Sequence, residues 1–201
     1  MGLNLVQFPD SAKIAEISAK LLDSDVLVCP AGQKMPGPAG PKMSFRSCAL
    51  LVKKDGNALH AARKTSDFVA VRGSTPELCS WAANSKGVDL LLQPFSSERC
   101  FLDLQTANVL AQNDVYVCFL FGEFLEADGS RLPHLIKNAS MCARLCRSAG
   151  AKMLFVSGAK NEMQMRASKD LASFAALIGV KKEEALKAVR SGAEDFLGRL
   201  K

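Results

Sequence analysis

Short, strongly apolar runs recur along this chain and are separated by segments with helical periodicity. This alternation predicts a parallel sheet, because neighbouring parallel strands need a crossover connection and the crossover is usually a helix. The run Val115–Phe121 is apolar almost throughout, as in a strand that is buried on both faces. The expected strands cover residues 3–8, 25–29, 48–52, 68–71, 88–92, 115–121 and 153–156.

Helices are expected between and after these strands. The longest, over residues 133–149, has proline in its first turn and is followed by a glycine. Ser74 and Glu77 have the spacing of a capping box for another helix. Ser191 and Gly192 are expected to separate the last two helices. The expected helices cover residues 12–22, 57–64, 74–84, 101–112, 133–149, a segment from 168 onward, 181–189 and 193–197.

About seven parallel strands alternating with helices favour an α/β fold that is TIM-barrel-like, one unit short of the usual eight. A doubly wound open sheet is the alternative. The 201 residues are 48 % apolar and no linker divides them, so we expect a single domain over residues 1–201. One connection differs from the others. The segment Pro30–Pro41 holds four prolines and three glycines, which predicts an exposed loop, and its glycines lack the spacing of a phosphate-binding loop.

Positive charge is concentrated in the later part of the chain. Residues 1–130 hold 12 basic and 14 acidic side chains, whereas residues 131–201 hold 14 basic and 6 acidic ones, for a net charge of +6. A basic balance confined to one part of a fold favours a polyanionic partner. A solvated, lysine-rich helical surface is the alternative explanation.

Seven cysteines are spread along the chain without a CxxC pair. Their odd number, in a chain that starts without a secretory leader, predicts free thiols in a reducing cytoplasm. Cys142 and Cys146 are four residues apart on an expected helix and are expected to pack in the core. The longest apolar run is far too short to span a bilayer, so no membrane partner is expected.

The segment Ala151–Gly179 carries the clearest candidate site. Its strand stops at Ser157, and Lys160, Arg166 and Lys169 all follow within thirteen residues of the end of the strand. Ligands of alternating α/β proteins bind at the carboxyl ends of the strands, and arginine and lysine suit phosphate. Ser157 is therefore expected to form a polar turn that faces an anion. The other candidate cations, which follow strands or lie on the long helix, are Arg72, Arg99, Arg131, Lys137 and Arg144.

Catalytic residues are not evident. His60 and His134 have contexts typical of structural residues, and the first strand offers neither histidine nor carboxylate for a metal site. Asp103 is expected to cap a helix, and Asp170 either to orient a nearby cation or to be solvated. The chain has one tryptophan and one tyrosine, and many of its phenylalanines lie in apolar runs, so base-stacking platforms for a single strand are not evident. Contact with the phosphates of a structured RNA, read by its shape, fits the cations best.

Three segments resemble one known family, the protein component 3 subunit of archaeal ribonuclease P, which is related to a eukaryotic ribonuclease P subunit. They are GVDLLLQPF at 87–95, FLDLQTANVLAQNDVYVCF at 101–119 and CARLCRSAGAKMLFVSGAKNEMQMRASKDLASFAALIGVKKEEALKAV at 142–189. In the last segment a basic helix is followed by a strand ending in Ser-Gly-Ala, then by an arginine, a basic residue and Asp-Leu. The resemblance extends from about Val69 to the C terminus, whereas the first 65 residues fit by architecture alone.

This resemblance implies a barrel-like subunit that binds the catalytic RNA of the enzyme that removes 5′ leaders from precursor tRNA. The chain would hold no cofactor and no catalytic residue, and Mg²⁺ would be bound at the RNA, which carries the catalysis. The implied partners are the ribonuclease P RNA, protein component 2, the other protein subunits and precursor tRNA. Leu104 and Ser80 stand where the family often has histidine and arginine. The basic positions that match the family are Arg131, Arg166 and Lys169, with Lys152 a weaker match.

Two other functions stay open. A free-standing barrel enzyme could act on a phosphorylated small molecule and use the turn from Ser157 to Lys160 as a phosphate cup. A scaffold without a nucleic-acid role is the third possibility. The RNA-binding subunit and the enzyme differ in the salt dependence of their binding. Several phosphate contacts make RNA affinity fall steeply as salt rises, whereas the affinity of a single phosphate site responds much less.

Overall fold

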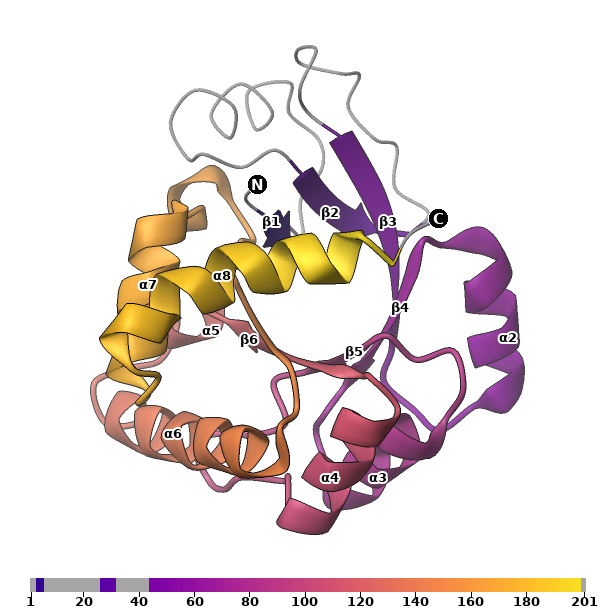
Figure 1. Ribbon diagram of the computed structural model, residues 1–201, viewed down its shortest axis with the longest axis horizontal. Coiled ribbons are helices and arrows are strands. Elements are labelled where there is room, and N and C mark those ends of the chain that lie inside the picture. The colour runs from indigo at the N-terminus through magenta and orange to yellow at the C-terminus, as the bar shows by residue number, and fades with distance from the viewer. Residues whose placement is uncertain (1–2, 6–25, 32–43, 200–201) are drawn as a thin grey trace.

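The computed structural model of the protein describes residues 3–5, 26–31 and 44–199. Among these residues, seven strands form one sheet in which each strand pairs in parallel with the next along the chain. Cα atoms of the two edge strands approach within 8 Å, so the sheet curls round almost to closure (Figure 1). The strands are β1 (Leu3–Leu5), β2 (Val26–Pro30), β3 (Ser44–Leu51), β4 (Phe68–Arg72), β5 (Leu90–Leu92), β6 (Tyr116–Leu120) and β7 (Met153–Val156).

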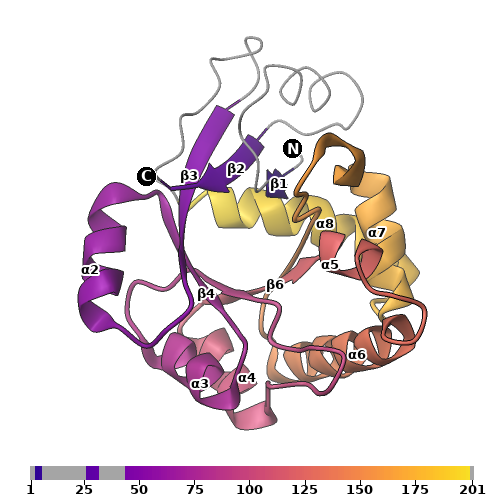
Figure 2. The ribbon, with the colours of Figure 1, turned by 180° about the vertical axis from the view of Figure 1, so that it is seen from behind.

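Helices pack against the strands from β3 to β7, as the two opposite views in Figures 1 and 2 show. Strand order follows chain order without reversal, whereas a doubly wound sheet reverses at its switch point. The TIM-barrel-like prediction is therefore confirmed and the open sheet is wrong. The expected helix 12–22 and most of the loop 30–41 lie outside the described residues. The described helices are α2 (Gly56–Thr65), α3 (Pro76–Asn84), α4 (Leu104–Gln112), α5 (Gly122–Leu125), α6 (Leu132–Ala149), α7 (Ser168–Leu177) and α8 (Lys182–Leu197), with a 3₁₀ turn η1 (Glu162–Gln164).

Two apolar layers follow from the alternation of side chains along each strand. On β4, Val69 and Val71 point outward and pack with the surrounding helices. Phe68 and Ala70 point inward, where the strands pack on one another inside the barrel. All five residues of β6 are buried, as the apolar run in the sequence predicted. β4 and β6 are thus covered on both faces, which is the usual condition of strands in a parallel sheet.

The start of α3 differs from its prediction. Thr75, not Ser74, is the N-cap residue, and its hydroxyl accepts a hydrogen bond from the Leu78 N–H at 3.2 Å. Pro76 follows at the first helical position, where its missing N–H costs nothing. The proline therefore sets the helix start one residue later than the expected capping box. In contrast, Asp103 caps α4 as expected, because its carboxylate accepts from the Thr106 N–H at 2.7 Å.

The expected break at Ser191 and Gly192 is wrong, because α8 runs through both as one helix. A Cβ at Gly192 would lie only 3.1 Å from the backbone carbonyl oxygen of Met153. The glycine therefore allows the helix to lie close against β7 and does not end it. Neither α5 nor η1 was predicted, since each is a single turn with little periodicity.

Helix α8 closes the end of the barrel at which the strands begin (Figure 1). Phe196 is 1 % exposed and enters the interior layer. Its ring stacks on Phe68 with centroids 4.5 Å apart and meets the Tyr116 ring edge-on at 5.1 Å. Because these two partners begin β4 and β6, the aromatic contact seals the interior at this end.

A polar network joins α8 to the same end of the barrel. The Tyr116 hydroxyl donates to the Asp195 carboxylate at 2.5 Å, and the Lys152 ammonium donates to that carboxylate at 2.7 Å. Burial, together with the hydrogen bond to Asp195, raises the pKa of Tyr116 to about 12. Hydrogen bonds from Lys152 and Tyr116 lower the pKa of Asp195. Neutral tyrosine and ionised aspartate are therefore the forms that the folded state favours.

The raised pKa of Tyr116 makes a testable prediction at alkaline pH. Its contribution to stability is complete below the ordinary tyrosine pKa of about 10 and is lost as pH rises through about 12. We expect Tyr116→Phe to lower the free energy of unfolding by about 1 kcal/mol at pH 8, and this difference to shrink between pH 10 and 12. Urea unfolding of both proteins at several pH values measures it. The buried thiols, whose pKa values are raised by desolvation, titrate alike in both proteins, so a difference that stayed constant would refute the assignment.

The described cysteines form no disulfides. Within residues 44–199 all six have free thiols. Cys142 and Cys146 are completely buried between α6 and the sheet. Among the described helices, none has the length and hydropathy to cross a bilayer.

Candidate RNA interface

Helix α5 directly follows β6 and places acidic side chains at the carboxyl end of the sheet. The Arg72 guanidinium, at the end of β4, donates to the Glu123 carboxylate at 2.8 Å. The Lys160 ammonium, after β7, donates to Glu126 at 2.5 Å. Hydrogen bonds from Lys160 and Gln164 hold the pKa of Glu126 below its usual value. Arg72 and Lys160, which follow different strands, therefore both lie at the carboxyl end of the barrel, as the sequence predicted. We use "the α5 rim" for Arg72, Glu123, Glu126, Arg131, Lys160, Gln164 and Arg166.

The turn after β7 helps to position α5. The carbonyl oxygen of Ser157 accepts a hydrogen bond from the Gly122 N–H at 2.7 Å, which fixes the start of α5. Gly158 has φ of +58°, and a Cβ there would lie 2.9 Å from the Leu120 Cβ, so the turn requires glycine. Ser157 itself is 0 % exposed. The expectation that its hydroxyl faces an anion is therefore wrong, and the proposed phosphate cup has no exposed serine.

Arg166 lies across the entrance to α7. Its guanidinium donates to the carbonyl oxygens of Met163 and Met165, both at 2.7 Å, and lies 5.4 Å from the centroid of the Phe121 ring. The Phe121 ring in turn meets Phe174 of α7 at 5.1 Å. Figure 2 shows α5 beside α7 at this side of the molecule. Arg166 thus holds the η1 segment against α5 while it adds positive charge to the rim.

Lys169 is exposed in the first turn of α7. Asp170 is also exposed, and its carboxylate accepts a hydrogen bond from the Ala167 N–H at 3.4 Å. Of the two alternatives for Asp170, solvation agrees with the structure, with capping of α7 as an additional role.

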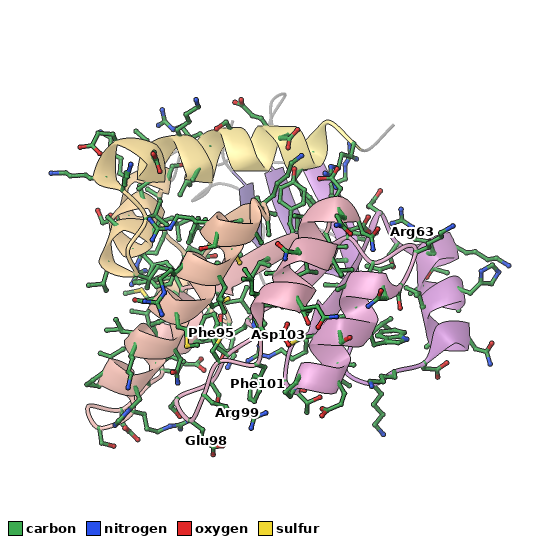
Figure 3. The ribbon with its side chains drawn as sticks, turned by 60° about the horizontal axis from the view of Figure 1, so that its bottom comes forward. Arg63, Phe95, Glu98, Arg99, Phe101 and Asp103 are labelled. Carbon is green, nitrogen blue, oxygen red and sulfur yellow. The ribbon has the colours of Figure 1, made fainter. Side chains whose placement is uncertain are left out.

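Arg131 belongs to the rim and Arg99 lies beside it, and both side chains are exposed. The Arg131 Nε is 3.5 Å from the Ser97 hydroxyl, and its backbone N–H donates to Asp128 at 2.8 Å. The Arg99 guanidinium lies 5.4 Å from the centroid of the Phe101 ring. Figure 3 shows Arg99 at the outer end of the segment that precedes α4. Both side chains can therefore reach a large partner at this end of the barrel.

The remaining candidates lie elsewhere. Lys137 and Arg144 are exposed two turns apart on α6, on one face as expected. Lys152 lies at the opposite end of the barrel, where it pairs with Asp114 at 3.1 Å and with Asp195. His60 and His134 are both exposed, and across the described part of the chain no group of three or more His, Cys, Asp or Glu side chains is arranged to hold a metal ion.

The acidic members of the rim were missed in the sequence. Glu123 and Glu126 follow the apolar run 115–121 directly, so the rule that grouped the cations after strands applies to them as well. Their pairing with Arg72 and Lys160 matters, because it neutralises two of the predicted cations. The more accessible positive charge at this end therefore lies on Arg99, Arg131 and Lys169.

The family model for RNase P subunit p30 matches residues 50–199, well over half of the chain. The chain belongs to the RNase P p30 family. Ribonuclease P protein component 3 of Methanococcoides burtonii is 28 % identical over 149 residues, which are 72 % of this chain and 61 % of that protein. The protein of the same name from Methanosarcina barkeri is 26 % identical over 153 residues, 74 % of this chain and 64 % of that protein. These matches span less than two thirds of both relatives.

The fold of this p30 family member resembles that of chains in solved structures. A chain in the cryo-EM structure of archaeal ribonuclease P with mature tRNA matches with a TM-score of 0.81 at 15 % identity, covering 98 % of this chain and 90 % of that one. A crystal structure of an amidohydrolase matches with a TM-score of 0.54 at 17 % identity, covering 94 % and 47 %. At such identities the similarity shows the barrel-like fold alone.

Proposed function

We propose that this chain is an RNA-binding protein subunit of a ribonuclease P, and that it supports the catalytic RNA while 5′ leaders are removed from precursor tRNA. The observation that carries the proposal is the p30 family match over residues 50–199, which contains the whole α5 rim. In this proposal the RNA breaks the phosphodiester bond and binds the Mg²⁺. Protein component 2 and the other protein subunits are the proposed protein partners.

The contacts of the cations at and beside the rim support two different roles for them. Arg72 and Lys160 are bound to Glu123 and Glu126, so we assign them to holding α5 in place. Arg131, Arg166 and Lys169 are assigned to RNA phosphates, because phosphate contacts give affinity and fix orientation without reading sequence. Arg99, Lys137 and Arg144 would extend the same contact along the neighbouring surface.

Salt dependence tests the proposal directly. We expect the full chain to bind the ribonuclease P RNA of its own source with a log–log salt slope of about −2 or steeper, as three or more phosphate contacts require. Fluorescence anisotropy from 50 to 400 mM potassium chloride measures this slope, with a single-phosphate ligand such as orthophosphate for comparison. Reconstituted cleavage of precursor tRNA should need the RNA. A shallow slope, or cleavage by the chain alone, would overturn the proposal.

A further inference from the structure

A cavity of about 290 Å³ lies at the carboxyl ends of β5 and β6, between α5 and the start of α6. Arg72, Glu123 and Arg131 of the rim line it, and Phe95 and Leu135 supply apolar wall. Barrel ligands bind at this end, and small-molecule sites begin at roughly 300 Å³. The cavity thus has the position and size to hold one small group.

Gln93 lines this cavity in a costly conformation. It directly follows β5, is 1 % exposed, and has φ of +47°, in the left-handed region that glycine favours. Its Oε1 accepts a hydrogen bond from the Leu120 N–H at 3.0 Å, whereas its Nε2 is buried and has no hydrogen-bond partner among the described residues. Strained residues and unpaired buried donors cluster at functional sites. A ligand with an acceptor atom would give this amide its partner.

The surrounding backbone holds Gln93 in place. Its N–H donates to the Cys118 carbonyl at 2.9 Å, and its own carbonyl accepts from the Phe95 N–H at 2.7 Å. The Phe95 ring packs 5.5 Å from Phe119, centroid to centroid. The unpaired amide is therefore fixed by both strand and core, as a preorganised binding group would be.

The charges of the lining are nearly balanced. Glu123 accepts from Arg72 through one carboxylate oxygen, and Glu126 accepts from Lys160 and Gln164. A phosphate would meet two carboxylates here, which disfavours an anion. The lining offers the second oxygen of Glu123 as an acceptor, and Gln93 Nε2 and Arg131 as donors. A neutral planar group with donors and acceptors on adjacent atoms matches this lining best.

We infer that the cavity binds a single unstacked nucleobase, with guanine the best match. Its O6 and N7 accept from the Arg131 guanidinium and Gln93 Nε2, and its N1–H and exocyclic N2 amino group donate to the second carboxylate oxygen of Glu123. Proteins that read RNA commonly take single bases out of the stack in this way. The base can belong to RNA or to a free nucleoside. Binding of a base that belongs to RNA rests on the proposed function, whereas binding of a free nucleoside does not.

The test titrates the ¹⁵N-labelled full chain with guanosine, adenosine, cytidine, uridine and orthophosphate. It follows the side-chain amide resonance of Gln93 and the backbone N–H resonance of Phe95, which also lines the cavity and stays observable in every variant. Gln93→Glu keeps the oxygen that faces Leu120 but replaces the donor by an acceptor. We expect it to weaken guanosine binding by about 10-fold or more, and Glu123→Gln to weaken it as well. Glu98→Gln is the matched control, because Glu98 is exposed on the adjacent turn and does not line the cavity (Figure 3). If Gln93→Glu fails to fold, as its thermal transition would show, Glu123→Gln carries the test.

A second arm uses ribonuclease P RNA that contains 6-thioguanosine, crosslinked to the chain by ultraviolet light and mapped by mass spectrometry. A crosslink within the peptide that contains Gln93 and Phe95 supports the RNA source. Guanosine binding without that crosslink indicates that the ligand is a free nucleoside. In that case the proposed RNA binding is judged by the salt test alone. The inference is overturned if no nucleoside shifts Gln93 and no crosslink maps there, if Glu98→Gln weakens binding as much as Gln93→Glu, or if orthophosphate displaces guanosine.

Discussion

Phe196→Ala is expected to lower the free energy of unfolding by about 3–5 kcal/mol, the usual cost of emptying a fully buried phenylalanine site. The ring is 1 % exposed and contacts both Phe68 and Tyr116, so its removal leaves a cavity at the end of the barrel. The aromatic contacts themselves add to the loss. Because a domain is stable by only about 5–15 kcal/mol, this single substitution removes a large share of the total.

Urea unfolding followed by far-ultraviolet circular dichroism measures this loss. Leu186→Ala is the matched control, since Leu186 lies on the same helix with 36 % of its surface exposed. We expect the control to cost less than about 1 kcal/mol, because surface substitutions rarely cost more. Similar losses in the two variants would mean that α8 contributes through its helicity and not through the aromatic seal.

The second large effect is expected on RNA affinity. Replacing Arg131, Arg166 and Lys169 together by alanine should weaken binding by about 100-fold near 0.15 M salt, because each lost phosphate contact costs roughly 5-fold there. The salt slope should become shallower by about 2 to 3 for the same reason. Anisotropy titrations of wild type and variant across a salt series give both numbers.

The control removes the same charge from the other end of the molecule. Lys64, Lys182 and Lys187 are exposed on α2 and α8, and their triple alanine variant should change affinity by less than about 5-fold. Arg166 also binds the η1 carbonyls, so the double variant of Arg131 and Lys169 is measured alongside. Equal losses in the two triple variants would show that net charge, and not the position of Arg131, Arg166 and Lys169 at the carboxyl end of the barrel, determines RNA binding.

Much of the fold follows from local patterns, and the failures have tertiary causes. The buried strand β6 was evident because every residue in it is apolar. The break expected at Gly192 was wrong because the reason for that glycine is the Met153 carbonyl, which lies about forty residues earlier in the chain. A breaker residue and a residue that permits close packing look the same in a sequence.

The candidate site was predictable in position but not in its pairing. Cations after strands were expected at one end of the barrel, and Arg72 and Lys160 do lie together there through α5. Which of them are neutralised depends on Glu123 and Glu126, whose rotamers and distances no spacing rule supplies. The strained conformation of Gln93 had no signal at all, because its sequence context, a strand followed by Gln-Pro, is that of an ordinary strand end.

The aromatic contact between α8 and the barrel also constrains how the protein is made. Phe196 meets Phe68 across 128 residues of chain, and α8 comes after every one of the seven strands. Contacts this distant in sequence are slow to form, since a long loop must close first. A nascent polypeptide emerging from the ribosome would therefore leave one end of the apolar interior uncovered until α8 is synthesised, and that exposed apolar surface would make it prone to aggregation.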